Sequence, residues 1–150
     1  MANVPVTKNQ EIELNIDDLG AEGQGVGRYS GYAVFVPGAL PGETVRARVV
    51  KAGKAFGFGK LLEVVRVSAQ RVDPICEAFG RCGGCTLMHL SYEGQLAYKR
   101  ERVRQALLRI GRFEDADVLP VIGMDHPIRY RNKGAFTAGT GADAAPALGL

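Results

Sequence analysis

Strict alternation of polar and apolar side chains marks the segment Glu11-Ile-Glu-Leu-Asn-Ile-Asp17. A period of two predicts a β-strand that buries one face, here formed by its three apolar residues. The same alternation recurs over residues 44–49 and predicts another strand. We also expect a pair of strands on either side of Gly31, within residues 28–36, and a last strand over 60–67. Pro-Gly and Gly-rich turns separate these segments. Five short strands without a helical pattern predict a closed or nearly closed Greek-key barrel of the OB type.

Barrels of this type commonly bind single-stranded nucleic acid, with basic side chains against phosphates and aromatic rings against bases. The segment Lys54-Ala-Phe-Gly-Phe-Gly-Lys60 is typical of such a surface, since two phenylalanines alternate with glycines. The glycine string over residues 23–27 is not expected to bind a dinucleotide, because that fingerprint needs a helix directly after it. These glycines should instead permit a bend and close strand packing. The barrel residues predicted to contact RNA are Arg28, Lys51, Lys54, Phe56, Phe58 and Lys60.

The chain has three cysteines, Cys76, Cys82 and Cys85, close together in the sequence. Their odd number and the lack of an apolar leader argue against a disulfide framework, and thiolates this near one another are typical of a metal centre. Three interpretations stay open. The favoured one is an iron–sulfur cluster, which thiolates on a compact loop can ligate. The others are a zinc site completed by His89 and a dithiol redox pair of Cys82 and Cys85.

The second half of the chain is expected to contain one helix, capped by Ser91 and extending to about Arg112. Leu96, Val103, Leu107 and Ile110 recur at helical spacing and predict a buried stripe. Short strands are expected over residues 118–122 and 130–138. Because one helix and two strands make a thin core, a bound metal would act as a staple, and the last dozen residues are expected to fray.

The net charge of +3 is mild, but its distribution is uneven. A first cluster of basic residues lies in the predicted helix, and a second follows it closely. Together they fit a partner that carries phosphates. No apolar run approaches the twenty residues of a membrane span, so no membrane association is expected and the chain is expected to be cytoplasmic. The clusters are Lys99, Arg100, Arg102, Arg104, Arg109 and Arg112, then Arg129, Arg131 and Lys133.

The chain resembles the beginning of the TRAM-containing RNA uracil-C5 methyltransferases, of the RumA type that acts on 23S ribosomal RNA. Five sequence blocks carry the resemblance, in family order and over nearly the whole length. They are Glu22-Gly-Gln-Gly-Val-Gly27, Phe35-Val-Pro-Gly-Ala-Leu-Pro-Gly-Glu43, Cys76-x5-Cys82-Gly-Gly-Cys85, His89-Leu-Ser-Tyr92-x-x-Gln95 with Lys99, and Tyr130-Arg-Asn-Lys133.

The resemblance implies a mainly β or α+β chain: an OB-like TRAM barrel over residues 1–72, then a cysteine-rich cluster loop, one helix and the first strands of a truncated central domain over 73–150. It implies that Cys76, Cys82 and Cys85 are three ligands of a 4Fe–4S cluster whose fourth ligand lies outside this chain. It also implies that Arg131 and Lys133 open a central domain that touches RNA. Arg129, which lies in the same basic cluster, is predicted to contact RNA with them.

Members of this family transfer a methyl group from S-adenosylmethionine to a flipped-out uracil, which a catalytic cysteine first activates by adding to C6. The resemblance places the cofactor domain and that cysteine further along, so this chain is expected to have no catalytic residue and no turnover alone. We expect a monomer that binds RNA, ribosomal in origin, and not DNA. Two alternatives stay open: a stand-alone TRAM-type RNA-binding module, and a zinc-stabilised RNA-binding protein with a Cys3His site.

Overall fold

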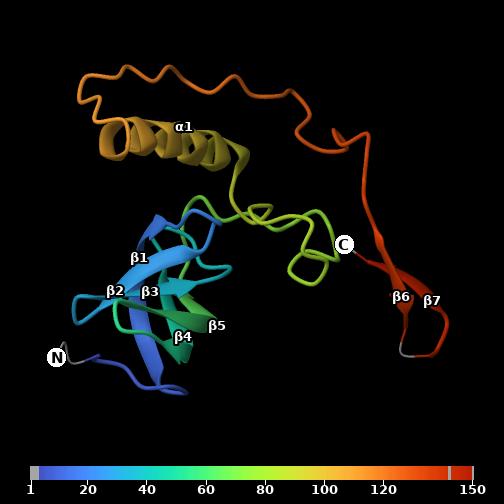
Figure 1. The fold of residues 1–150 in the computed structure, drawn as a ribbon, viewed down its shortest axis with the longest axis horizontal. Coiled ribbons are helices and arrows are strands. Elements are labelled where there is room, and N and C mark those ends of the chain that lie inside the picture. The colour runs from blue at the N-terminus through green and yellow to red at the C-terminus, as the bar shows by residue number, and fades with distance from the viewer. Residues whose placement is uncertain (1–3, 142, 150) are drawn as a thin grey trace.

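A computed structural model describes residues 4–141 and 143–149 (Figure 1). Five strands form a closed barrel: β1 (Glu11–Leu19), β2 (Gly25–Tyr29), β3 (Tyr32–Val36), β4 (Thr44–Ala52) and β5 (Phe56–Arg66). After a loop, the helix α1 (Tyr92–Arg109) lies across one end of the barrel. An extended segment then passes along α1 to a separate hairpin of β6 (Thr137–Thr140) and β7 (Pro146–Gly149).

The strand order around the barrel is β1-β2-β3-β5-β4. All neighbours pair antiparallel except β3 and β5, which pair in parallel. β4 and β5 form a hairpin, and the pairing of β5 with β3 and of β4 with β1 closes the barrel. The alternation seen in the sequence is the alternation of burial: Ile12, Leu14 and Ile16 are 4%, 2% and 2% exposed, and the apolar positions of β4 meet them in one core. The predicted five-stranded OB-like barrel is therefore confirmed.

The last barrel strand begins earlier than predicted, at Phe56 instead of residue 60. Glycines usually weaken a strand, but here Gly57 and Gly59 point into a crowded interior. A Cβ on Gly59 would lie 3.2 Å from the side chain of Ala47 and 3.4 Å from that of Val36. The glycines therefore belong to the strand because the barrel is narrow there.

The glycine string of residues 23–27 also serves close packing, as predicted. A Cβ on Gly27 would lie only 2.5 Å from the carbonyl oxygen of Asn15 on β1. Gly23 adopts a φ of +78°, which favours glycine, and a Cβ there would lie 2.8 Å from the Thr86 side chain. A strand follows the string, so the structure has no helix terminus at that place to receive a phosphate.

The helix begins where the sequence indicates. The side chain of Ser91 accepts a hydrogen bond from the backbone N–H of Gly94 at 3.1 Å, which makes Ser91 the N-cap. The predicted buried stripe is wrong, because α1 contains no buried residue: Leu96 and Leu107 are only half-buried, Val103 is 50% exposed and Ile110, just after the helix, is 84% exposed. The reason is that the helix contacts the barrel and the extended segment mainly through hydrogen bonds, with the Tyr98 ring packed against a small apolar cluster that includes Leu90, and no described sheet covers the predicted stripe.

The predicted strand over 118–122 is also wrong. Helix side chains bind the backbone of this extended segment, which therefore needs no neighbouring strand: Arg100 Nε donates to the carbonyl of Val118 at 2.6 Å, and the Tyr92 hydroxyl accepts from the N–H of Met124 at 2.7 Å. The strand expected over 130–138 overlaps β6 only at its end.

Fraying of the last dozen residues is contradicted for the described part of the tail. There, β6 pairs antiparallel with β7 over four residue pairs, from Thr137–Gly149 to Thr140–Pro146. The prediction failed because the sequence after β6 supplies a partner strand that its composition did not suggest. Residues 142 and 150, which the prediction also covered, lie outside the described residues. Across residues 4–141 and 143–149, no helix combines the length and the apolar character that crossing a bilayer requires.

Candidate nucleic-acid interface and thiol loop

Three phenylalanines form a cluster on the outer face of the barrel, which we call the three-ring cluster: Phe35, Phe56 and Phe58. Their ring centroids lie 5.5 to 5.7 Å apart, with two pairs close to edge-to-face. Phe35 lies between the buried residues of β3, so alternation turns its ring outward, and Phe56 is 47% exposed. Exposed rings on an OB-type barrel provide π-faces on which bases can stack.

Strand register places cations around this cluster. Arg28 on β2 pairs with Ala33, which in turn pairs with Phe56, so Arg28 and Phe56 share one row across three strands. Lys51 pairs with Phe58 in the same way. Cross-strand neighbours in a row lie on the same face of a sheet, so these basic side chains border the rings.

The cations of this face differ in whether they are neutralised. Arg46 and Arg48 form ion pairs of 2.7 Å with Glu63 and Glu11. In contrast, no ion pair to any described residue engages Arg28, Lys51 or Lys60, and all three are exposed. They therefore remain available to an anionic partner.

The structure thus brings together most of the barrel residues predicted to contact RNA. Arg28, Lys51, Phe56, Phe58 and Lys60 share the outer face, and Lys54 is exposed in the turn between β4 and β5. Three other residues predicted to contact RNA are exposed on the segment that leads to β6, and this segment lies apart from the barrel (Figure 1). They are Arg129, Arg131 and Lys133. Phe35 was missed, although the alternation of β3 could have shown that its side chain points outward.

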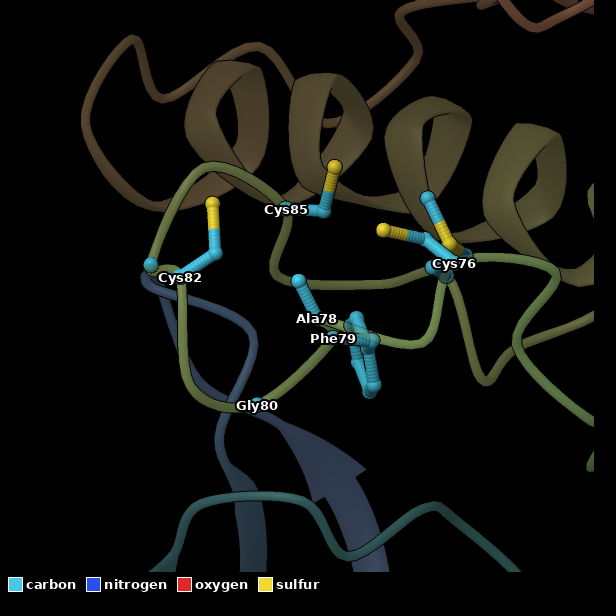
Figure 2. Close-up of a pocket in the computed structure, with 8 residues that line it drawn as sticks. Cys76, Ala78, Phe79, Gly80, Cys82 and Cys85 are labelled. Atoms are coloured by element: carbon cyan, nitrogen blue, oxygen red, sulfur yellow. The ribbon is translucent and has the colours of Figure 1, made fainter. Parts of the chain in front are cut away.

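The three cysteines lie on an irregular loop between β5 and α1, residues 67–91, which we call the thiol loop. Backbone hydrogen bonds within this loop form turns. Backbone N–H groups of Phe79 and Cys82 donate to the carbonyls of Cys76 and Ala78 at 3.0 and 2.9 Å. All three thiols are free and line one small cavity of about 20 Å³, and their sulfur atoms lie on the same side of the loop (Figure 2). Gly80 and Gly83, with φ of +80° and +76°, make the turns that bring the cysteines to this cavity.

The donor set suits a soft metal centre, because only thiols, apolar side chains and backbone surround the cavity. Among the described residues, however, no three His, Cys, Asp or Glu side chains are already close enough to hold a single metal ion.

His89 does not join the thiols at their cavity. Its ring is 2% exposed, packs 5.2 Å from the ring of Phe79, and has both nitrogens without a partner among the described residues. Burial, followed by the charge of Arg71, lowers the pKa of His89, so the ring is held neutral. Packing against an aromatic ring fits the position of His89 better than metal ligation does.

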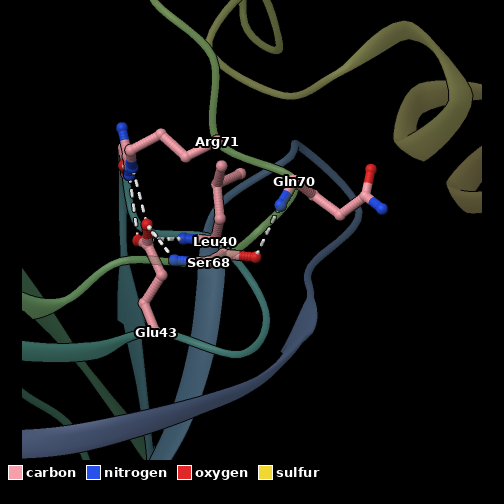
Figure 3. A network of polar contacts seen from close by, with 6 residues as sticks. Leu40, Glu43, Ser68, Gln70 and Arg71 are labelled. Atoms are coloured by element: carbon pink, nitrogen blue, oxygen red, sulfur yellow. Dashed lines mark hydrogen bonds and ion pairs between the residues drawn. The ribbon is translucent and has the colours of Figure 1, made fainter.

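A buried ion pair fastens the thiol loop to the barrel (Figure 3). Glu43, at 0% exposure, accepts from Arg71 Nε and Nη2 at 2.6 and 2.9 Å, and Arg71 Nη2 also donates to the carbonyl of Gly38 at 2.7 Å. The backbone N–H of Leu40 and that of Ser68 donate to the same carboxylate. Burial alone would raise the pKa of Glu43, but these donors and the guanidinium outweigh it and keep the pKa below its usual value.

A second set of hydrogen bonds connects the helix to the barrel and to the thiol loop. The Tyr98 hydroxyl donates to the carbonyl of Gly20 at 2.6 Å, and Gln95 Nε2 donates to the carbonyls of Leu87 and Leu90. Together with the ion pair, these contacts place the barrel, the thiol loop and α1 side by side.

The chain is similar to known proteins over the barrel and over most of its length. Residues 5–62 match the TRAM domain family. An uncharacterized RNA methyltransferase of Halalkalibacterium halodurans is 47% identical over 135 residues, which are 90% of this chain and 30% of that protein. Uncharacterized RNA methyltransferases of Listeria innocua and Clostridium acetobutylicum are 47% and 41% identical, over 88% and 95% of this chain and 29% and 31% of theirs. The chain thus spans about 30% of the length of these curated relatives.

Among solved structures, a conserved protein of Methanococcus maripaludis is 36% identical to this chain, with a TM-score of 0.40. The match covers 42% of this chain and 90% of that one.

Proposed function

We propose, on the premise that this chain belongs to the TRAM-domain RNA methyltransferases, that its barrel binds single-stranded RNA for a methyltransferase. One observation supports the proposal most directly: the three-ring cluster lies on one outer face with Arg28, Lys51 and Lys60, none of which is neutralised by a described acidic residue. Rings stack on bases while cations meet phosphates, so this combination suits a flexible strand whose bases are unpaired.

Binding of a labelled single-stranded RNA of about ten nucleotides, followed by fluorescence anisotropy, tests this proposal. Loss of one stacked base costs about 1–3 kcal/mol, so Phe56→Ala should weaken binding about 5- to 140-fold. Phe136→Ala is the matched control, because Phe136 is 60% exposed but lies outside the barrel. Equal affinities for the two variants would contradict stacking at the barrel.

We also propose that Cys76, Cys82 and Cys85 ligate a 4Fe–4S cluster, with a fourth ligand from outside this chain. Support comes from the thiol-lined cavity and from the absence of His89 from its lining. Three cysteine ligands on one loop would give the cluster a structural role, since metal binding contributes to folding free energy. Stabilising the loop is the only chemistry that we assign to it.

The cluster can be tested without any activity measurement. Protein prepared anaerobically should be brown, absorb broadly near ~400 nm and contain iron and sulfide, and Cys82→Ser should remove the colour. Colourless protein that carries zinc, and loses it on His89→Ala, would instead establish the Cys3His alternative. Protein that binds neither would leave the stand-alone RNA-binding module as the better description.

The similarity to RNA methyltransferases extends the proposal to a longer protein that would contain this chain. We propose that such a protein transfers a methyl group from S-adenosylmethionine to C5 of a uracil in RNA, with ribosomal RNA as the substrate. This chain would hold the RNA, and its three thiols would be occupied as ligands and unable to act as the nucleophile. Purified chain should therefore bind RNA but release no methyl group from labelled S-adenosylmethionine; methylation by the chain alone would contradict this assignment.

A further inference from the structure

We propose that one face of α1 continues the RNA-binding surface of the barrel. This basic face consists of Lys99, Arg102 and Arg109. A single RNA strand would then pass from the three-ring cluster, over the loop between β1 and β2, to the helix, where its phosphates meet these cations. The inference rests on the proposed function, because it extends the same bound strand.

Helical geometry aligns the three cations. Positions 99, 102 and 109 are separated by three and seven residues, so with 3.6 residues per turn their side chains project on one side of α1. All three are exposed, and none forms an ion pair or a side-chain hydrogen bond with the described part of the chain. Attraction to the helix C-terminus explains a cation at Arg109 in the last turn, but it leaves Lys99 and Arg102 unexplained.

The other cations of the helix are engaged. Arg104 forms a 2.8 Å ion pair with Glu101, and Arg100 Nε donates to the carbonyl of Val118. The arginines of this helix thus divide into those whose side chains have partners within the chain and those whose side chains are exposed without one among the described residues. Such a division is what a surface for an external anion requires.

Contacts at Gly20 connect the basic face to the three-ring cluster. The carbonyl of Gly20 accepts from the Tyr98 hydroxyl, and a Cβ on Gly20 would lie 3.2 Å from the ring of Phe35. Arg102 lies one turn beyond Tyr98 on the same side of the helix. The rise of 1.5 Å per residue places Arg109 about 16 Å beyond Tyr98, so the combined surface suits several nucleotides more than the barrel alone.

A matched pair of double variants tests the inference. R102Q/R109Q removes two charges from the basic face, and R100Q/R104Q removes the same two charges from the engaged face. Far-ultraviolet circular dichroism should show that both variants keep the helix. Affinities are measured at several salt concentrations for single-stranded RNAs of roughly four and roughly twelve nucleotides.

We expect R102Q/R109Q to lose two phosphate contacts with the longer RNA. Its salt slope should then fall by about 1.4, with binding about 20-fold weaker near 0.1 M salt, because each single-strand contact contributes about 0.7 to the slope. The shorter RNA should bind both variants equally, since the barrel alone holds it. R100Q/R104Q should keep the slope of the unmodified chain.

Other outcomes separate the two proposals. Equal weakening by both double variants, or no weakening by either, would overturn the basic face while Phe56→Ala still reports binding at the barrel. Failure of the unmodified chain to bind either RNA would overturn the proposed function, and this inference with it.

Discussion

The barrel and the part of the chain that follows it differ in how they are held together. Of the buried apolar residues in the described part of the chain, all but Leu90 come from residues 6–49. Most of them fill one core inside the barrel, and Leu19 and Leu40 form a small second cluster with Leu90. The described residues of α1 and of the β6–β7 hairpin include no buried side chain. The barrel is therefore stabilised by burial of apolar surface, whereas the helix adds the Tyr98 ring to the small second cluster and relies mainly on hydrogen bonds to the barrel and to the thiol loop. This difference predicts which substitutions will lower the free energy of unfolding most.

The largest contrast should appear between two apolar truncations. Leu14 is 2% exposed in the barrel core and Ile110 is 84% exposed after the helix. Leu14→Ala should lower the free energy of unfolding by about 4 kcal/mol, because it removes buried methyl groups and leaves a cavity. Ile110→Ala should change it by less than about 0.5 kcal/mol. Urea unfolding measures both values, and a large effect of Ile110→Ala would mean that the helix has a hydrophobic interface after all.

The ion pair between Glu43 and Arg71 is the strongest polar connection between the two regions. Arg71→Ala should cost about 3 kcal/mol, since it leaves the fully buried carboxylate of Glu43 without its cation. Arg46→Ala is the control, because its ion pair with Glu63 is about half exposed at both ends and should contribute less than about 1 kcal/mol. Urea unfolding of the two variants compares them, and similar losses would show that Glu43 finds other donors when Arg71 is removed.

Sequence reasoning predicted the barrel better than the rest because a barrel strand carries its own signal. Alternation at Ile12, Leu14 and Ile16 determines which face is buried wherever the strand pairs. The spacing of Leu96, Val103 and Ile110 also predicts that one face of the helix is buried. Spacing alone, however, does not show whether another helix or a sheet packs against that face. The prediction of a strand over 118–122 was wrong for a similar reason. Side chains of α1, which lie earlier in the sequence, form hydrogen bonds with the backbone of this segment in place of a neighbouring strand.

The candidate sites show the same limit. Sequence reasoning proposed Phe56 and Phe58 from their alternation with glycine. Alternation in β3 could have shown that Phe35 points outward, but only the parallel pairing of β3 and β5 shows that it lies beside the other two rings. Likewise, composition alone could not pair Glu43 with Arg71, since a contact between residues 28 positions apart depends on how the chain returns to the barrel. The cysteines are close in sequence, so their shared cavity was predictable, but their spacing does not decide between an iron–sulfur cluster, a zinc ion and a dithiol pair.

Two glycines offer a smaller and more local test of the contact between the regions. Gly23 and Gly31 both have φ near +80°, but only at Gly23 would a Cβ meet the segment after the cysteines, 2.8 Å from Thr86 and 3.0 Å from Leu87. Gly31→Ala should therefore cost about 1 kcal/mol from backbone strain alone, and Gly23→Ala about 2 kcal/mol. Gly23→Ala should also speed proteolysis of the thiol loop. Equal costs and equal proteolysis would show that the barrel loop does not support that segment.

The smallest expected effect belongs to the ion pair on the surface of the helix. The hydrogen bond from Arg104, followed by that from Gln105, lowers the pKa of Glu101 to about 2. Because the pKa in the folded chain lies below the usual value of 4.5, the helix stabilisation from this pair is complete above about pH 4.5 and is lost as the pH falls through about 2. Circular dichroism of the unmodified chain and of Glu101→Gln should differ slightly near neutral pH and converge in acid. A difference that persists in acid would mean that Glu101 supports the helix by packing and not by its charge, and the polar description of α1 would then need revision.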